Sequence, residues 1–202
     1  MHVVTSPQLR ADGTSTLTGR QAALLDQLTD LFLTRGFRGF TLEDLAVELS
    51  CSKSTLYALA ASKEQLAARV VEYFFRRAAG RVETQVVRRR SAAARVREYL
   101  LAVASELAAA SPTFLADVAA NPLTRGSYER HTAIAADRIR ALVAAGVESG
   151  DFRAVDPVFL GEVVAAGMDA IERGGVTTRT GLTHAEAYAQ LAALVLAAVR
   201  TD

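Results

Sequence analysis

Hydrophobic positions recur at three- and four-residue spacing along almost the whole chain. Leu42, Leu45, Ala46 and Leu49, for example, occupy positions i, i+3, i+4 and i+7, as on one face of an amphipathic helix. No stretch shows the sustained alternation with β-branched residues that predicts a strand. Gly and Pro fall between the periodic segments. The pattern therefore predicts an all-α protein of about nine helices.

Capping signals mark where these helices begin. A Ser, Thr or Asp followed three residues later by Glu, Gln or Asp satisfies the first backbone N–H groups of a helix. A capping residue before Pro has the same effect, because Pro is favoured at the first helical position. The starts are Thr18-x-x-Gln21, Thr41-x-x-Asp44, Ser52, Ser62-x-x-Gln65, Ser111-Pro112, Asp156-Pro157 and Thr183-x-x-Glu186. We expect long helices over 18–36, 62–89, 92–110, 112–120, 126–149 and 157–173, short helices after Thr41 and Ser52, a last helix from Thr183, and a loop over 174–182.

The two short helices have the layout of a helix-turn-helix. They are separated by the tight break Ser50-Cys51-Ser52. Phe40 precedes the Thr41 cap and Leu45 lies at the fourth helical position, which is the spacing of a hydrophobic staple.

The start of the second short helix carries the chemistry expected of a DNA-reading element. Hydroxyl groups, a lysine and a tyrosine suit phosphate oxygens and base edges. A helix N-terminus adds free N–H groups and a positive dipole, and a recognition helix enters the major groove with its N-terminal residues leading. The predicted DNA-binding residues are Thr41, Ser52, Lys53, Ser54, Thr55, Tyr57 and Lys63.

Residues 20–66 resemble the DNA-binding domain of the TetR family of transcriptional regulators. The resemblance rests on Arg35-Gly36-Phe37, Thr41-Leu42-Glu43-Asp44-Leu45-Ala46, Ser52-Lys53-Ser54-Thr55-Leu56-Tyr57 and Ser62-Lys63-Glu64-Gln65-Leu66. It implies a C-terminal helical domain for ligand binding and dimerisation. The chain departs from the family at Ser50, where a Gly is usual, and at Leu59-Ala60, where Tyr-Phe is usual.

The hydrophobic pattern and the resemblance together predict three regions. Residues 1–17 are expected to form a flexible arm, 18–66 the helix-turn-helix domain, and 67–202 the ligand-binding and dimerisation domain. The helix from Ser62 links the last two regions. A cavity between helices would take its lining from apolar and aromatic residues; the candidates are Phe74, Tyr99, Phe114, Tyr128, His131 and Met168. Pairing of the last two helices across a twofold axis would form the dimer interface; the candidates are Val164, Met168, Ile171, Tyr188, Leu191, Val195 and Val199.

Charge adds weight to a nucleic-acid partner. The 202 residues carry a net charge of +1, but residues 1–90 balance to +4 and residues 91–202 to −3. Only two of the 23 basic residues are lysines, Lys53 and Lys63, and both lie in the predicted DNA-binding set. A basic end suits an anionic partner.

Composition narrows the remaining classes. The longest apolar run, Leu191 to Val199, is short of the ~18 residues of a membrane helix, and the N-terminus lacks a signal-peptide pattern. A cytoplasmic protein is therefore expected. Cys51 has no second cysteine to pair with, and the three histidines are scattered, so we expect neither a metal site nor a cofactor.

The sequence thus predicts a homodimeric DNA-binding regulator, a repressor released from its operator by a small, mostly apolar effector. One alternative is a helix-turn-helix used for protein contact. Another is an enzyme on a helical bundle, which would need paired carboxylates, a nucleophile with its base, or metal ligands. The helices after residue 91 show none of these groups at defensible spacing.

Overall fold

The computed structural model describes residues 18–200, and this part of the chain is helical without a strand. The predicted arm, 1–17, lies outside the described residues. The helices are α1 (Gly19–Arg35), α2 (Leu42–Glu48), α3 (Lys53–Tyr57), α4 (Lys63–Val86), α5 (Ala92–Leu107), α6 (Pro112–Ala120), α7 (Pro122–Glu148), α8 (Pro157–Glu172), α9 (Gly175–Thr180) and α10 (His184–Val199).

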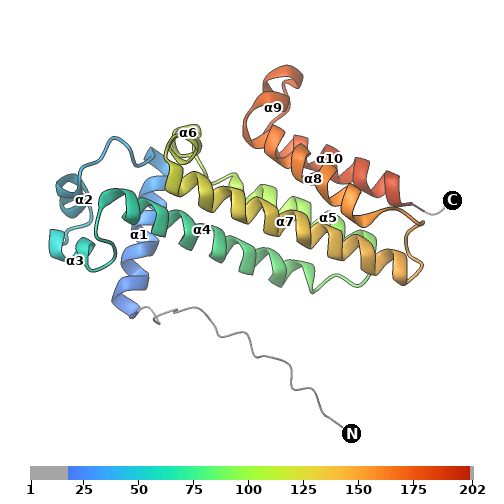
Figure 1. Ribbon diagram of the computed structural model, residues 1–202, viewed down its shortest axis with the longest axis horizontal. Coiled ribbons are helices and arrows are strands. Elements are labelled where there is room, and N and C mark those ends of the chain that lie inside the picture. The colour runs from blue at the N-terminus through green and yellow to red at the C-terminus, as the bar shows by residue number, and fades with distance from the viewer. Residues whose placement is uncertain (1–17, 201–202) are drawn as a thin grey trace, which may run out of the picture.

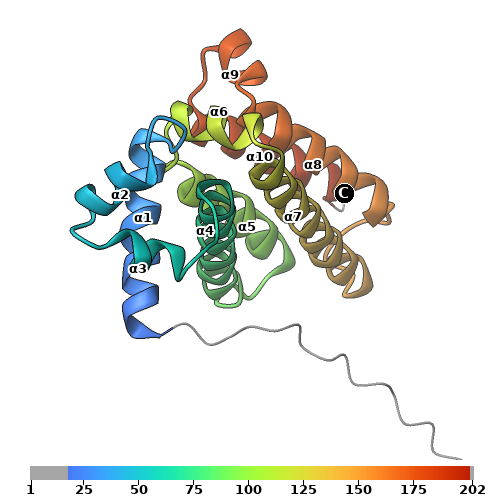
Figure 2. The same ribbon diagram turned by 60° about the vertical axis from the view of Figure 1, so that its left-hand side comes forward.

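The helices form a small head and a larger body. The head, α1 to α3, lies at one end of the molecule in Figure 1, and α4 runs from it along the body beside α5 and α7. Figure 2 looks nearly down α4, with the head on one side and α7 and α8 on the other. Helices α8 and α10 cover the body at the end away from the head, and α9 projects from them.

The predicted capping residues hold the helix starts. Thr18, Thr41 and Thr183 form reciprocal capping boxes with the residue three positions on. Ser52 and Ser62 each accept the backbone N–H three residues later. These caps fix where each helix begins, and hence which face it turns inward.

Two sequence expectations are corrected. Helix α7 begins at Pro122, not near residue 126, because Asn121 caps it by accepting the N–H groups of Leu123 and Thr124. Asn121-Pro122 is the same type of signal as Ser111-Pro112. The predicted loop over 174–182 contains α9, bounded by Gly174 and Gly181 in left-handed conformations, so the described residues form ten helices rather than nine.

The interior consists of two hydrophobic clusters. One joins α5, α7, α8 and α10 with the C-terminal half of α4. The other joins the head with the N-terminal half of α4 and with Phe114 and Val118 of α6. The core of the head therefore extends past residue 66, into α4 and α6.

Within residues 18–200, no single helix has the length and apolar content needed to cross a membrane; α5 and α6 reach them only as a pair, which is bent by 92°.

Candidate DNA-binding surface and interior cavity

The turn between α2 and α3 sets the direction of α3. Ser50 is left-handed, with φ of 49°, and the Cys51 N–H donates to the Ala46 carbonyl over 2.9 Å. Leu45 of α2 and Leu56 of α3 are both fully buried in the head core. Because both helices pack against the head core on one side, the start of α3 lies at the surface on the other.

That start gathers the predicted hydroxyl and basic groups. The Ser52 hydroxyl lies 2.7 Å from that of Ser54 and 2.8 Å from that of Thr55. Lys53 is exposed, and Tyr57 is 52% exposed. Five polar side chains and the first N–H groups of α3 thus share one patch of surface.

Lys53 forms an ion pair with Glu43 of α2. The hydrogen bond and the charge of Glu43 raise the pKa of Lys53, and the same contact lowers the pKa of Glu43. The pair brings α2 and α3 together at the surface. It also places a carboxylate beside the one cation of the recognition helix.

The other acidic residues of α2 are also engaged within the head. Asp44 accepts the Thr41 N–H at 2.8 Å and the Thr41 hydroxyl at 2.7 Å; these two bonds lower the pKa of Asp44. Glu48 pairs with Arg35 at 2.5 Å. The Thr41 hydroxyl therefore already donates its hydrogen bond within the protein.

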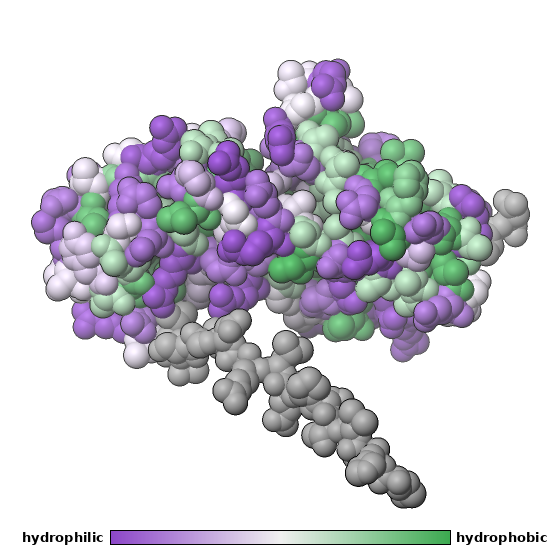
Figure 3. Space-filling model, viewed as in Figure 1, coloured by the Kyte–Doolittle hydropathy of each residue, from purple (hydrophilic) through white to green (hydrophobic). Residues whose placement is uncertain are grey.

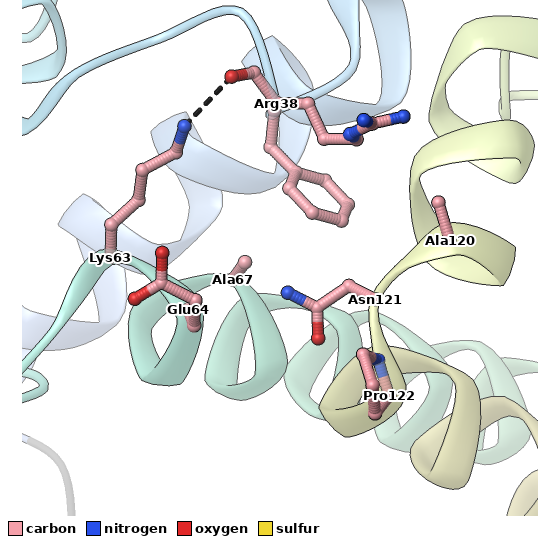
Figure 4. A pocket seen from close by; sticks show the side chains of 8 residues that line it. Arg38, Lys63, Glu64, Ala67, Ala120, Asn121 and Pro122 are labelled. Carbon is pink, nitrogen blue, oxygen red and sulfur yellow. Dashed lines mark hydrogen bonds between the residues drawn. The ribbon is translucent and has the colours of Figure 1, made fainter.

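Lys63, at the first position of α4, supports the loop before α2. Its ammonium donates to the Arg38 carbonyl over 2.8 Å (Figure 4). An ammonium has three N–H donors, so two remain for a DNA phosphate. Lys63 also borders a cleft of about 270 Å³ between the head and the α6–α7 junction, with Asn121 and Pro122 on the opposite side (Figure 4).

A buried aspartate fastens the head to the body. Asp117 of α6 is 6% exposed, and its Oδ2 accepts the N–H groups of Phe37 at 2.7 Å and Arg38 at 2.9 Å. Gly36 has φ of 71°, and a Cβ on it would lie 2.6 Å from that oxygen. The sequence analysis missed Asp117, although a single acid within the apolar segment Pro112–Ala120 was a usable signal.

The body contains a cavity of about 200 Å³ between α4, α5, α7, α8 and α10, which opens to the surface beside the exposed Ile134. Four of the six predicted ligand-binding residues line it, namely Tyr99, Tyr128, His131 and Met168. The structure places the other two, Phe74 and Phe114, outside it. They lie in the head core with their rings edge to face, 6.1 Å apart, because the N-terminal half of α4 faces the head and not the cavity.

Most charged groups around the cavity are paired. Arg138 holds Glu83 through two hydrogen bonds of 2.7 and 2.8 Å, and Arg81 holds Glu106. His131 contacts Glu72 at 3.2 Å and stacks on Phe75.

Glu172, at the end of α8, has no such partner. Its Oε1, the Tyr188 hydroxyl and the His184 Nε2 are buried, and none of them makes a well-formed hydrogen bond to another described residue, although the Tyr188 hydroxyl lies close enough to the Glu172 carboxyl to interact with it. Burial raises the pKa of the Glu172 carboxyl. The nearby Tyr188 and His184 lower this pKa, but only partly offset the effect of burial. Burial, and then the neighbouring Glu172 carboxylate, raise the pKa of Tyr188.

The predicted dimer-interface residues lie mostly inside the chain. Val164, Met168, Ile171, Tyr188, Val195 and Val199 are each at most 5% exposed. Leu191 is half-buried and packs against Gly167 of α8, where a Cβ would lie 3.2 Å from its Cδ1. These side chains join α8 and α10 within one protomer, so little of their surface is left for a second subunit.

Cys51 is half-buried, and burial raises the pKa of its thiol. A raised thiol pKa disfavours the reactive thiolate. Among residues 18–200, no three His, Cys, Asp or Glu side chains are grouped as metal ligands.

Residues 24–70 match the family model described as bacterial regulatory proteins, tetR family. No curated protein sequence matches the chain.

Solved structures share the fold over nearly the whole chain. A transcriptional regulator from Saccharomonospora viridis in complex with choline matches with a TM-score of 0.73 and 18% identity, covering 90% of this chain and 97% of that one. A TetR/AcrR-family regulator from Thermobifida fusca has a TM-score of 0.68 and 19% identity, with coverage of 91% and 100%. FadR from Bacillus subtilis in complex with stearoyl-CoA has a TM-score of 0.70 and 12% identity, with coverage of 89% and 99%.

Proposed function

We propose that this chain, which belongs to the TetR family of bacterial regulatory proteins, is a dimeric transcriptional regulator that binds operator DNA through α2 and α3. The observation that carries the proposal is the surface patch at the start of α3, where Ser52, Lys53, Ser54 and Tyr57 lie on a rigid helix-turn-helix. In the major groove, such a patch reaches base edges and phosphates together.

Each predicted residue has a proposed part in DNA binding. Lys53, Ser54, Thr55 and Tyr57 contact the operator, and Lys63 positions the DNA backbone beside it. Thr41 joins Lys63 when a phosphate replaces Asp44 as the acceptor of its hydroxyl. Ser52 caps α3 and supports its hydroxyl cluster. Residues 18–66 form the DNA-binding head and 67–202 the effector-binding and dimerising body, with α4 as the link.

Operator selection tests this proposal. The full-length protein is used to select duplexes from a random library, and their affinity is then measured by fluorescence anisotropy. Lys53→Ala is expected to lower the affinity for the selected duplex by about 10-fold or more. Arg97→Ala removes an exposed positive charge from α5, on the body, and is the matched control. Equal affinities for Lys53→Ala and the parent protein would refute DNA contact by α3.

The salt dependence of binding separates this function from the rival role in protein contact. DNA affinity falls steeply with salt because protein cations displace condensed counterions. Lys63→Ala is expected to reduce the slope of log K against log salt by about 1. A helix-turn-helix that serves protein contact would show neither the affinity for duplex DNA nor the slope.

An apolar face on α8 and α10 is the proposed dimer interface. Phe159, Val163 and Leu194 are 70%, 47% and 68% exposed. Hydrophobic residues gather over this part of the body in Figure 3, whereas the head is mainly hydrophilic. Exposed Ala166, Ala193 and Ala197 let a second pair of helices approach closely. An isologous four-helix contact would place the two heads on successive half-sites.

The cavity is the proposed effector site. Two proteins of the same fold hold small molecules, choline in one and stearoyl-CoA in the other. An effector bound here releases the DNA only if the operator-competent and released forms of the dimer bind it with different affinity. We propose that the body binds the effector and does not catalyse a reaction. We also propose that the protein is a repressor and that it acts in the cytoplasm.

A further inference from the structure

The carboxyl groups that line the cavity outnumber its guanidinium and ammonium groups. They are Glu83, Glu106 and Glu172 against Arg138, and His131 lines the cavity as well. Arg138 is used by Glu83, and Glu106 is held by Arg81, which approaches from outside the lining. Glu172 is therefore the one lining carboxylate of the described residues without a basic partner.

The buried polar atoms without partners all lie around this carboxylate. Within residues 18–200 they are Glu172 Oε1, Tyr188 Oη and His184 Nε2. Tyr188 is fully buried, and both Tyr188 and Glu172 line the cavity. Burying a polar group without a hydrogen bond is unfavourable, so native proteins keep few such groups. Three in one place point to a bound partner that completes them.

The surroundings of Glu172 are aromatic and apolar. Tyr99, Tyr128 and Tyr188 line the same cavity as Glu172. Val82, Val103 and Leu107 line the cavity as well. Aromatic faces attract cations through the negative potential above the ring.

We infer that the cavity binds a small organic cation, whose ammonium head lies between the Glu172 carboxylate and the tyrosine rings and whose apolar part lies against Val82, Val103 and Leu107. This inference rests on the proposed function, in which the cavity is the effector site. A neutral apolar ligand would leave Glu172 unpaired, and an anion would be repelled by it. The volume of about 200 Å³ lies below the roughly 300–1,000 Å³ of sites for drug-sized ligands, so the part of the cation inside the cavity is small.

His184 is the competing internal counter-ion. Its charge acts on Glu172, yet the two groups form no ion pair in the structure. Other charged groups near Glu172 and Tyr128 are Asp169 and Arg173, which pair with each other on α8.

Matched ligand pairs test the inference. Choline and 3,3-dimethylbutan-1-ol have nearly the same shape and differ in charge, as do phenyltrimethylammonium and tert-butylbenzene. Binding is measured by calorimetry and by thermal shift on the full-length protein, without DNA. In at least one pair the cation is expected to bind at least about tenfold more tightly than its neutral counterpart. Equal affinity, tighter binding of both neutral compounds, or no binding of any cation at 10 mM would overturn the inference.

Glu172→Gln tests the proposed contact. It keeps the shape of the side chain and removes the charge, so we expect it to lose the preference for the cation while its affinity for the neutral compound changes less than about twofold. Glu129→Gln makes the same change on the exposed face of α7 and is the control. Retention of the preference in a folded Glu172→Gln protein would also overturn the inference.

The DNA readout separates this inference from the proposed function. Suppose that the cations fail to bind, but the protein binds the selected operator and Lys53→Ala abolishes that binding. The proposed function as a DNA-binding regulator is then supported, and the inference of a cationic ligand is refuted. If the cations bind but no duplex does, the cavity is a cation site in a protein with another role.

Discussion

Ser50 occupies a backbone conformation that suits glycine better than serine. Its φ of 49° is the one positive φ of a non-glycine residue within the described chain. Left-handed geometry costs an L-residue about 1–2 kcal/mol. We expect Ser50→Gly to raise the free energy of unfolding by about 1 kcal/mol, measured by urea denaturation. Ser149→Gly is the control: its φ is −77°, so the same substitution there should give no gain.

Glu172 should make stability depend on pH. Its pKa in the folded chain is raised above the ordinary 4.5, chiefly by burial. The folded chain therefore holds this proton more tightly than the unfolded chain does. The resulting stabilisation is complete below the ordinary pKa and is lost as pH rises through the folded-state pKa.

Glu172→Gln removes this dependence. The unfolding free energy of the variant, relative to the parent, should increase as pH rises from about 4 and level off above the folded-state pKa. Chemical denaturation at several pH values without ligand measures the difference. A constant difference across the range would mean that burial does not raise the pKa of Glu172.

At the scale of elements, α2 and α3 are joined by a contact that DNA has to compete with. Lys53 is paired with Glu43 in the free protein, and both side chains are exposed. Glu43→Gln frees the lysine and removes a negative charge from the DNA-facing surface. We expect operator affinity to rise up to about fivefold at low salt, with less gain at high salt, in anisotropy titrations. Glu98→Gln breaks a similar pair with Arg89 on the body and should leave the affinity unchanged.

Helix α6 holds the loop that leads into α2. Asp117→Ala leaves the Phe37 and Arg38 N–H groups without their acceptor. We expect a loss of about 3 kcal/mol in unfolding free energy, together with weaker operator binding. Asp137→Ala removes an exposed acid paired with Arg140 on α7 and is expected to change stability by less than about 0.5 kcal/mol.

The sequence predicted the elements better than the contacts between them. Caps such as Thr41 and Ser52 act within four residues, so they can be read from local sequence. The missed N-terminus of α7 at Asn121 was equally local and readable. Helix α9 was harder, because its six residues are bounded by glycines with no side-chain cap.

The candidate sites depend on which buried face meets which neighbour. The helical pattern marks Phe74 and Tyr188 alike as inward-facing. Only packing decides that Phe74 joins the head core and Tyr188 the cavity. The same limit applies to the dimer: the apolar residues of α8 and α10 were predicted as an interface, but their inward members join the two helices of one protomer.

For the whole molecule, dimerisation and DNA binding should be lost together. Leu194 is 68% exposed on the proposed interface, and Leu194→Glu places two charges against each other across the twofold axis. We expect the dimer dissociation constant to rise about 100-fold, measured by analytical ultracentrifugation. Operator affinity should fall as well, because two linked heads bind more tightly than one.

Val87→Glu is the control for this change. Val87 is 66% exposed at the end of α4, away from the proposed interface, and the variant should remain dimeric. A dimeric Leu194→Glu protein would place the interface elsewhere.

The core that the head shares with α6 has a consequence for protein synthesis. Leu66, at the end of the predicted head, leaves the ribosome some fifty residues before Val118 completes that core. At 5–20 residues per second this delay is about 3–10 s. During it the nascent head lacks Phe114 and the Asp117 anchor. A chain still being translated therefore has an incompletely supported recognition helix, and tight operator binding begins only after α6 has emerged.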